Sequence, residues 1–137
     1  MRFAALALAL TLAASACGET VAAFQPGEVQ LVVELTDYKV VTNVATIRAG
    51  ETKIGVRNRG SQPHDLVLLR TDLAPDKLPY DVGRARADEP GLVARTKELR
   101  AGGTAAVTAT LEPGQYVIIC NVAGHYGLGM RTSLRVE

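Results

Sequence analysis

The alternation of apolar and polar residues along the chain predicts a series of short β-strands. About seven segments alternate or form brief apolar runs rich in Val, Ile and Thr: 29–35, 45–48, 52–58, 64–70, 104–111, 115–120 and 130–137. Turn sequences such as Asn58-Arg59-Gly60-Ser61 and Glu112-Pro113-Gly114 separate several of them. This pattern is typical of an all-β protein, and we expect a Greek-key antiparallel β-sandwich or barrel.

Two stretches interrupt the alternation. Residues 37–42 are expected to form an irregular crossing between strands. Residues 71–102 contain three prolines and many charges, which predicts a long insertion between strands. Within it, residues 92–99 have the apolar content for a helical turn or two, so a short helix is expected there. No internal repeat or low-complexity tract occurs.

The N-terminal stretch has the composition of an export signal. Arg2 is followed by an apolar run over residues 3–14 and by small residues before Cys17. The run is too short to span a bilayer, which takes roughly 20 apolar residues. We therefore expect export to the periplasm or cell surface. The chain divides into a predicted signal peptide, a tether and one folded domain: 1–16, 17–28 and 29–137.

Cys17 has three interpretations. The segment before it resembles a bacterial lipoprotein signal ending at the lipidated cysteine, which would anchor the domain to a membrane. Plain secretion with a free thiol is the alternative. Two cysteines in an exported chain also suggest a disulfide, but a bridge from Cys17 to Cys120 would tie a tail to the domain without stapling its core. Lipidation of Cys17 is preferred.

Charge and composition argue against several classes of protein. Without residues 1–16, Lys+Arg falls from 15 to 14 and equals Asp+Glu at 14. A formally neutral domain lacks the basic patch that nucleic acid binding needs. The sequence contains no phosphate-binding loop, and its two histidines leave no separate Ser-His-Asp set for a hydrolase. We expect a monomer with no nucleic acid partner.

The densest candidate chemistry lies near the C-terminus. Four residues separate Cys120 from His125, and four separate His125 from Met130. The other histidine, His64, follows Pro63 at the start of a predicted strand. Two imidazoles and a thiolate with a weak axial thioether form the ligand set of a blue-copper electron-transfer site. Thiolate and thioether suit Cu(I) and imidazole suits both oxidation states, so these four residues are predicted to bind one copper ion.

Taken singly, these residues have ordinary structural explanations. A histidine after a proline, such as His64, is commonly a surface or core residue. An apolar residue at the start of an alternating strand, such as Met130, commonly belongs to the core. All four occur together, however, in a chain with two histidines and two methionines, one of them the initiator. That coincidence favours the metal site.

Five motifs carry a family resemblance: Ala49-Gly50-Glu51, Asn58-x-Gly60, Pro63-His64-Asp65, Leu111-Glu112-Pro113-Gly114-Gln115-Tyr116 and Cys120-x4-His125-x4-Met130. Over residues 29–137 the chain resembles the cupredoxins, the blue type 1 copper proteins related to plastocyanin and azurin. The spacing after the cysteine is most similar to that of auracyanin and rusticyanin. The resemblance implies that His64, Cys120 and His125 bind copper in a trigonal plane, with Met130 as the axial ligand.

The resemblance extends to residues around the ligands. In cupredoxins the residue after the first histidine ties the two ligand loops together, and Asp65 holds that position here. Pro63 lacks an N–H group, which stiffens the approach to His64. Asn121, next to Cys120, is assigned to the same surroundings, where hydrogen bonds to the cysteine sulfur tune the reduction potential.

The resemblance implies a carrier of single electrons between redox proteins, and not an enzyme. Copper oxidases and nitrite reductases need a second copper site built from further histidines, which the chain lacks. In the family, the outer ring edge of the second histidine, here His125, reaches the surface. Uncharged neighbours suited to docking a redox partner surround it: Val122, Ala123, Tyr126 and Leu128. The alternative is a copper chaperone or storage protein, which usually carries clusters of Met or His.

Overall fold

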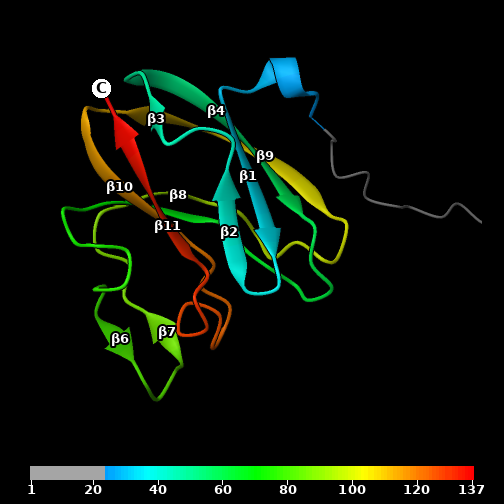
Figure 1. Ribbon diagram of the computed structural model, residues 1–137, viewed down its shortest axis with the longest axis vertical. Helices are drawn as coiled ribbons and strands as arrows, with labels where there is room; N and C mark the ends of the chain where they lie inside the picture. The colour runs from blue at the N-terminus through cyan, green and yellow to red at the C-terminus, as the bar shows by residue number, and fades with distance from the viewer. Residues whose placement is uncertain (1–23) are drawn as a thin grey trace, which may run out of the picture.

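Two β-sheets packed face to face form most of the computed structural model, which describes residues 24–137 (Figure 1). The first sheet contains, in spatial order, β2 (Lys39–Thr42), β1 (Leu31–Thr36), β4 (Gly50–Asn58) and β9 (Thr104–Leu111). The second contains β3 (Thr46–Ile47), β11 (Arg131–Val136), β10 (Gly114–Ile119), β5 (Val67–Arg70) and β8 (Leu92–Arg95). A separate hairpin is made of β6 (Tyr80–Asp81) and β7 (Arg86–Ala87).

The main core lies between the sheets and follows from the alternation within strands. In β1, Leu31, Val33 and Leu35 are buried, while the residues between them are half-buried. In β11, Leu134 and Val136 are buried in the same way. Successive side chains of a strand point to opposite faces, so one face of each strand contributes to the core. The strands of the sandwich fix the ends of the loops that connect them, including the β4–β5 and β10–β11 loops.

The predicted β-sandwich is confirmed, with two differences in its strands. Residues 39–42, expected to be irregular, form β2, which pairs antiparallel with β1. Each sheet also contains one parallel pairing, β1 with β4 and β3 with β11. The other pairings within the two sheets are antiparallel.

The expected helix in the insertion is wrong. Residues 92–95 form the edge strand β8, which pairs antiparallel with β5. His64 and Leu99 then exchange two backbone hydrogen bonds, of 3.0 and 2.7 Å. The open edge of β5 supplies hydrogen-bond partners that an isolated helical turn lacks, and such partners override a weak local preference for helix.

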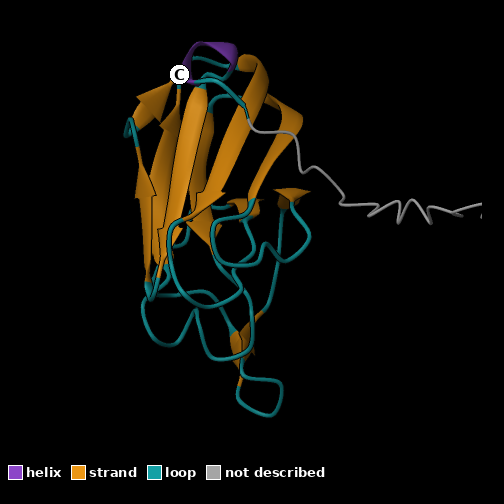
Figure 2. Cartoon of the chain, turned by 90° about the vertical axis from the view of Figure 1, so that its right-hand side faces the viewer, coloured by secondary structure: helices purple, strands orange, loops and turns teal. Residues whose placement is uncertain are grey.

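The insertion covers the outer face of the second sheet. Strand β5 contributes to two apolar clusters. Leu68, together with Leu66 just before the strand, faces the main core, and Val67 and Leu69 face a second apolar cluster. That cluster is formed by Val67, Leu69, Leu78, Ala87, Val117, Ile119 and Tyr126. The β6–β7 hairpin extends from the end of the sandwich where the loop between β10 and β11 lies (Figures 1 and 2).

The described chain begins with residues that the sequence assigned to the tether. Phe24 is buried, and its ring occupies the space beside Gly55 where a Cβ would otherwise lie. The Arg57 guanidinium lies 4.7 Å from the centre of that ring, and a short 3₁₀ turn follows at Pro26–Glu28. The predicted signal peptide and Cys17 lie outside the described residues. Within them, no helix has the length and apolarity to cross a membrane.

Candidate metal centre

Three of the four predicted ligands converge at one end of the sandwich. His64 lies in the loop between β4 and β5, Cys120 directly follows β10, and His125 lies in the loop that leads to β11. The two histidine Nδ1 atoms are 3.1 Å apart. Cys120 Sγ lies 3.7 Å from His64 Nδ1 and 3.4 Å from His125 Nδ1. Residues 61 positions apart in the sequence thus present their donor atoms to one point.

These separations fit one first-row transition metal ion. Such an ion binds imidazole nitrogen at about 2.0 Å and thiolate sulfur at about 2.3 Å. In a trigonal plane those lengths require about 3.5 Å between the nitrogens and about 3.7 Å between sulfur and nitrogen. The observed triangle is close to this size. A soft thiolate with two imidazoles favours copper.

Met130 is fully buried and is joined to the other ligands through the backbone. The Cys120 N–H donates to the Met130 carbonyl at 3.0 Å, and the Met130 N–H donates to the His125 carbonyl at 3.1 Å. Gly129 has a φ of 111°, a conformation that favours glycine, just before Met130. The turn at Gly129 therefore allows the loop to close and bring the fourth ligand back beside the cysteine.

Burial shifts the ionisation of two ligands. It raises the pKa of the Cys120 thiol to about 12 and lowers the pKa of His125, because a charged form is poorly solvated in the interior. The backbone N–H of Asp65 points at Cys120 Sγ at 3.4 Å, and a sulfur contact of this kind favours the thiolate. A metal cation must therefore displace the thiol proton when it binds.

Asp65 and Asn121 join the two ligand loops, as the sequence predicted for Asp65. The Asp65 carboxylate accepts a 2.6 Å hydrogen bond from the Asn121 N–H. The Asn121 side chain in turn exchanges two 2.9 Å hydrogen bonds with the backbone of Ala87 in the insertion. The Gly124 N–H donates to the Ala85 carbonyl at 2.7 Å. The insertion, whose role the sequence left open, thus holds the cysteine-bearing loop. Pro63 is exposed.

Asp37 also belongs to this centre, although the sequence analysis did not predict it. Its Oδ1 lies 2.8 Å from His64 Nε2, on the opposite side of the ring from the other ligands. Hydrogen bonds from the hydroxyl and backbone N–H of Ser61 hold the pKa of the Asp37 carboxyl well below its usual range. Asp37 is 27 positions from His64 and follows a strand with no motif, so no local spacing could have linked the two.

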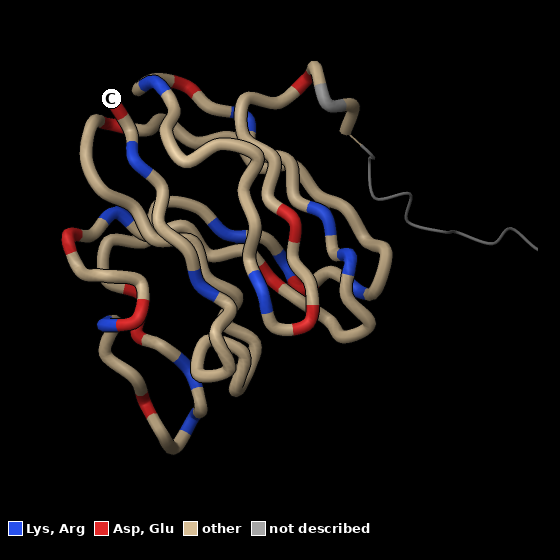
Figure 3. Tube along the Cα trace, in the orientation of Figure 1, with Lys and Arg blue, Asp and Glu red and all other residues tan. Residues whose placement is uncertain are grey.

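The predicted docking residues do not all reach the surface. Leu128 is 61% exposed and Ala123 is exposed, while Val122 is half-buried. Tyr126 was expected to take part in docking, but it is buried because its hydroxyl bonds to the backbone of the insertion. Tyr38, 43% exposed, packs edge-on against the His125 ring with centroids 5.5 Å apart. The loop over residues 120–130 carries no charged residue (Figure 3).

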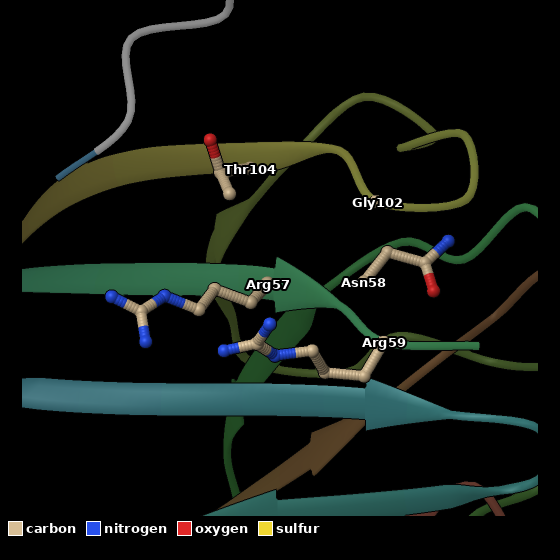
Figure 4. A pocket seen from close by; sticks show the side chains of 5 residues that line it. All are labelled: Arg57, Asn58, Arg59, Gly102 and Thr104. Atoms are coloured by element: carbon tan, nitrogen blue, oxygen red, sulfur yellow. The ribbon is translucent and has the colours of Figure 1, made fainter.

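A pocket of about 500 Å³ has none of the four predicted ligands in its lining. It is lined by Arg57, Asn58, Arg59, Gly102 and Thr104 (Figure 4). Arg59 forms an ion pair with Glu34 at 3.5 Å, and both side chains are exposed. These lining residues include no nucleophile held beside a base, so the pocket offers no support for an active site.

Comparison with known proteins agrees with the geometry. A family model described as copper binding proteins of the plastocyanin/azurin family matches residues 27–137. A search of curated proteins found no match. Among solved structures, reduced auracyanin from the photosynthetic bacterium Roseiflexus castenholzii has a TM-score of 0.57 and 22% identity, and the match covers 77% of this chain and 94% of that one.

Two further structures share the fold. Rusticyanin from Thiobacillus ferrooxidans has a TM-score of 0.62 and 16% identity, covering 78% of this chain and 75% of its own. An azurin (iso-2) from Methylomonas sp. strain J has a TM-score of 0.52 and 18% identity, covering 77% and 95% respectively. At these identities the structural matches support the fold, while the family model supports the copper site.

Proposed function

Since the chain belongs to the plastocyanin/azurin family of copper-binding proteins, we propose that it carries single electrons between redox proteins and is not an enzyme. His64, Cys120 and His125 converge as ligands of a single type 1 copper site, and the buried Met130 supplies the fourth. The observation that supports this proposal most directly is the buried triangle of His64 Nδ1, Cys120 Sγ and His125 Nδ1. When bound there, copper supplies a one-electron couple between Cu(I) and Cu(II).

The role of the polypeptide is to hold the copper ligands in fixed positions. His64 is held through its backbone by Leu99 and through its ring by Asp37. Cys120 is held by Met130 through the backbone and receives the Asp65 N–H at its sulfur. Ligands fixed by strands and hydrogen bonds move little between oxidation states, and little movement favours fast electron transfer.

The proposed electron route leaves through His125. His125 is 9% exposed as a residue, whereas His64 is fully buried. Tyr38 and Leu128 present exposed apolar surface near it, and no charge lies between Cys120 and Met130 (Figure 3). A small uncharged patch suits brief contact with a redox partner, since strong ion pairs would slow release.

Addition of Cu(II) to the purified domain tests the copper chemistry. We expect an intense visible charge-transfer band from the Cys120 thiolate, which Cys120→Ser abolishes because a hydroxyl cannot replace that bond. A colourless Cu(II) complex of the intact protein would instead favour the copper chaperone or storage function. The electron-transfer step is tested by mixing the oxidised and reduced forms and measuring their exchange rate. Leu128→Glu should slow exchange without changing the band.

We also propose that the protein is exported and anchored to a membrane by lipidation of Cys17. The support is the sequence of residues 1–17, with its positive charge, apolar run and small residues before the cysteine. Each buried CH₂ of an acyl chain adds about 0.8 kcal/mol to membrane binding. In the native host, Cys17→Ser should move the protein to the soluble fraction and leave the visible band unchanged. Soluble, unlipidated wild-type protein would refute the anchor.

A further inference from the structure

Asp37 contacts the His64 ring at Nε2, on the side opposite the Nδ1 atom that faces the other predicted ligands. His64 is fully buried, with Nδ1 directed at Cys120 and His125 and Nε2 directed at the Asp37 carboxylate, 2.8 Å away. A carboxylate has no proton to donate at neutral pH, so the hydrogen of this contact must lie on His64 Nε2. A ring whose one proton lies on Nε2 presents the Nδ1 lone pair to a metal.

Asp37 is itself fixed in place. Its Oδ2 accepts hydrogen bonds from the Ser61 N–H at 2.8 Å and the Ser61 hydroxyl at 2.7 Å, and its Oδ1 also accepts from the Gln62 N–H at 3.2 Å. The carboxylate thus joins the end of β1 to the loop that precedes His64. Its side chain is 28% exposed, so it retains its charge while touching a buried ring.

Gly60 leaves the room that this contact needs. A Cβ on Gly60 would lie 2.8 Å from His64 Nε2 and would overlap Asp37 Oδ1. Real Cβ atoms essentially never make such contacts. The Gly60 N–H is held by the Asn58 side chain at 2.8 Å, which fixes the glycine beside the carboxylate. The loop is therefore built around the Asp37–His64 pair.

We propose that Asp37 is a positioning and tuning residue for the copper centre: it fixes the His64 tautomer and, by its negative charge, favours Cu(II) over Cu(I), which lowers the reduction potential. This inference rests on the proposed copper chemistry. A ligating histidine that donates its second N–H to a carboxylate becomes a more basic ligand. The nearby charge also interacts more favourably with the dipositive ion.

The tautomer is tested first in the metal-free protein. Nitrogen-15 NMR of the imidazoles should show His64 with its proton on Nε2 at neutral pH, and that proton should exchange slowly with water. Asp37→Asn retains an oxygen acceptor and should keep the tautomer, whereas Asp37→Ala should release it. Because no copper is present, this result stands even if the intact protein fails to form the visible band. A His64 proton found on Nδ1 in the metal-free wild type overturns the inference.

The reduction potential is tested in the copper-loaded protein. Asp37→Asn removes the charge and keeps the contact, so the ratio of Cu(II) to Cu(I) affinities should fall about tenfold. For a one-electron couple this equals a rise of about 59 mV. Glu34→Gln is the matched control, because it removes a charge from the exposed Glu34–Arg59 pair without touching His64. Gly60→Ala keeps the charge but displaces the carboxylate, and it should also raise the potential.

The two variants separate a local effect from a general one. A larger rise for Asp37→Asn than for Glu34→Gln supports the assignment. Equal shifts in the two variants, or an unchanged potential in Asp37→Asn with the visible band intact, overturn the tuning role. Circular dichroism of each variant identifies any that fails to fold, in which case Gly60→Ala and Asp37→Asn serve as independent tests of the same contact.

Discussion

The carboxylate of Asp65 accepts a 2.6 Å hydrogen bond from the backbone N–H of Asn121, and both residues are buried. The residue after the first histidine is thereby joined to the residue after the cysteine, across 56 positions of sequence. Asp65 acts a second time through its own N–H, which points at Cys120 Sγ. Asp65 thus both joins the two ligand loops and contacts the cysteine sulfur.

Asp65→Ala should destabilise the copper-free protein by about 1–3 kcal/mol, because it leaves the buried Asn121 N–H without an acceptor. Asp65→Asn should cost less, since the amide oxygen can still accept that hydrogen bond. Urea denaturation at neutral pH measures both free energies of unfolding. Equal losses for the two variants would show that the charge of Asp65, and not its hydrogen bond, stabilises the fold.

Much of the fold and of the site could be predicted from short-range patterns. The strand over residues 104–111 was predicted with the bounds observed for β9, because its alternation continues over eight residues. The ligands could be recognised because histidine and methionine are rare in this chain and because Cys120, His125 and Met130 recur at a fixed spacing. Rare residue types at a regular spacing carry information that does not depend on the tertiary structure.

The rest depends on contacts that the local sequence does not encode. Residues 92–95 are too few to distinguish a strand from a helical turn, and the open edge of β5 decides the outcome. Tyr126 looks like a surface residue among glycines, but the insertion supplies partners for its hydroxyl 48 and 51 positions away. Asp37 likewise meets His64 only after β1 and the loop before β5 pack together.

Tyr126→Phe should loosen the insertion from the ligand loop. The Tyr126 hydroxyl accepts from the Leu78 N–H at 3.1 Å and donates to the Pro75 carbonyl at 2.9 Å. Its removal leaves a buried N–H unpaired, which costs about 1–3 kcal/mol. Chemical denaturation measures the loss. Tyr80→Phe is the control, since Tyr80 stacks on Tyr126 with its ring partly exposed, and a comparable loss there would refute this assignment.

The copper-free protein should be less stable in mild acid than at neutral pH. Burial lowers the pKa of His125 in the fold, while in the unfolded chain it stays near about 6.5. The unfolded state therefore takes up a proton first as the pH falls below about 6.5, and the free energy of unfolding decreases. Thermal unfolding between pH 7.5 and 5.5 (about one unit either side of that value) measures the loss, which His125→Gln should reduce.

The same protein should lose stability in base through Cys120. Its pKa is raised to about 12 in the fold, against about 8.5 when unfolded. The unfolded thiol therefore loses its proton first, and stability should fall by up to about 1.4 kcal/mol per pH unit above pH ~8.5. Denaturation of wild type and Cys120→Ala at successive pH values isolates this slope. Parallel pH dependence in the two proteins would exclude Cys120 as its source.

Met130 should tune the copper site without being essential for it. An axial thioether is a weak and long ligand that biases the reduction potential more than it contributes to affinity. Leucine is close to methionine in volume, so Met130→Leu should cost less than about 1.5 kcal/mol of stability in this fully buried position. The variant should keep the visible band and raise the potential, because Cu(II) loses a donor.

Met130→Gln gives the opposite test at the same position. An amide oxygen is an alternative axial ligand in such sites, and as a harder donor it favours Cu(II), so the potential should fall below that of the wild type. Voltammetry of the three proteins, with their visible spectra, measures both shifts. Complete loss of copper from Met130→Leu would show that the thioether is a principal ligand, and potentials unchanged in both variants would show that Met130 serves the core alone.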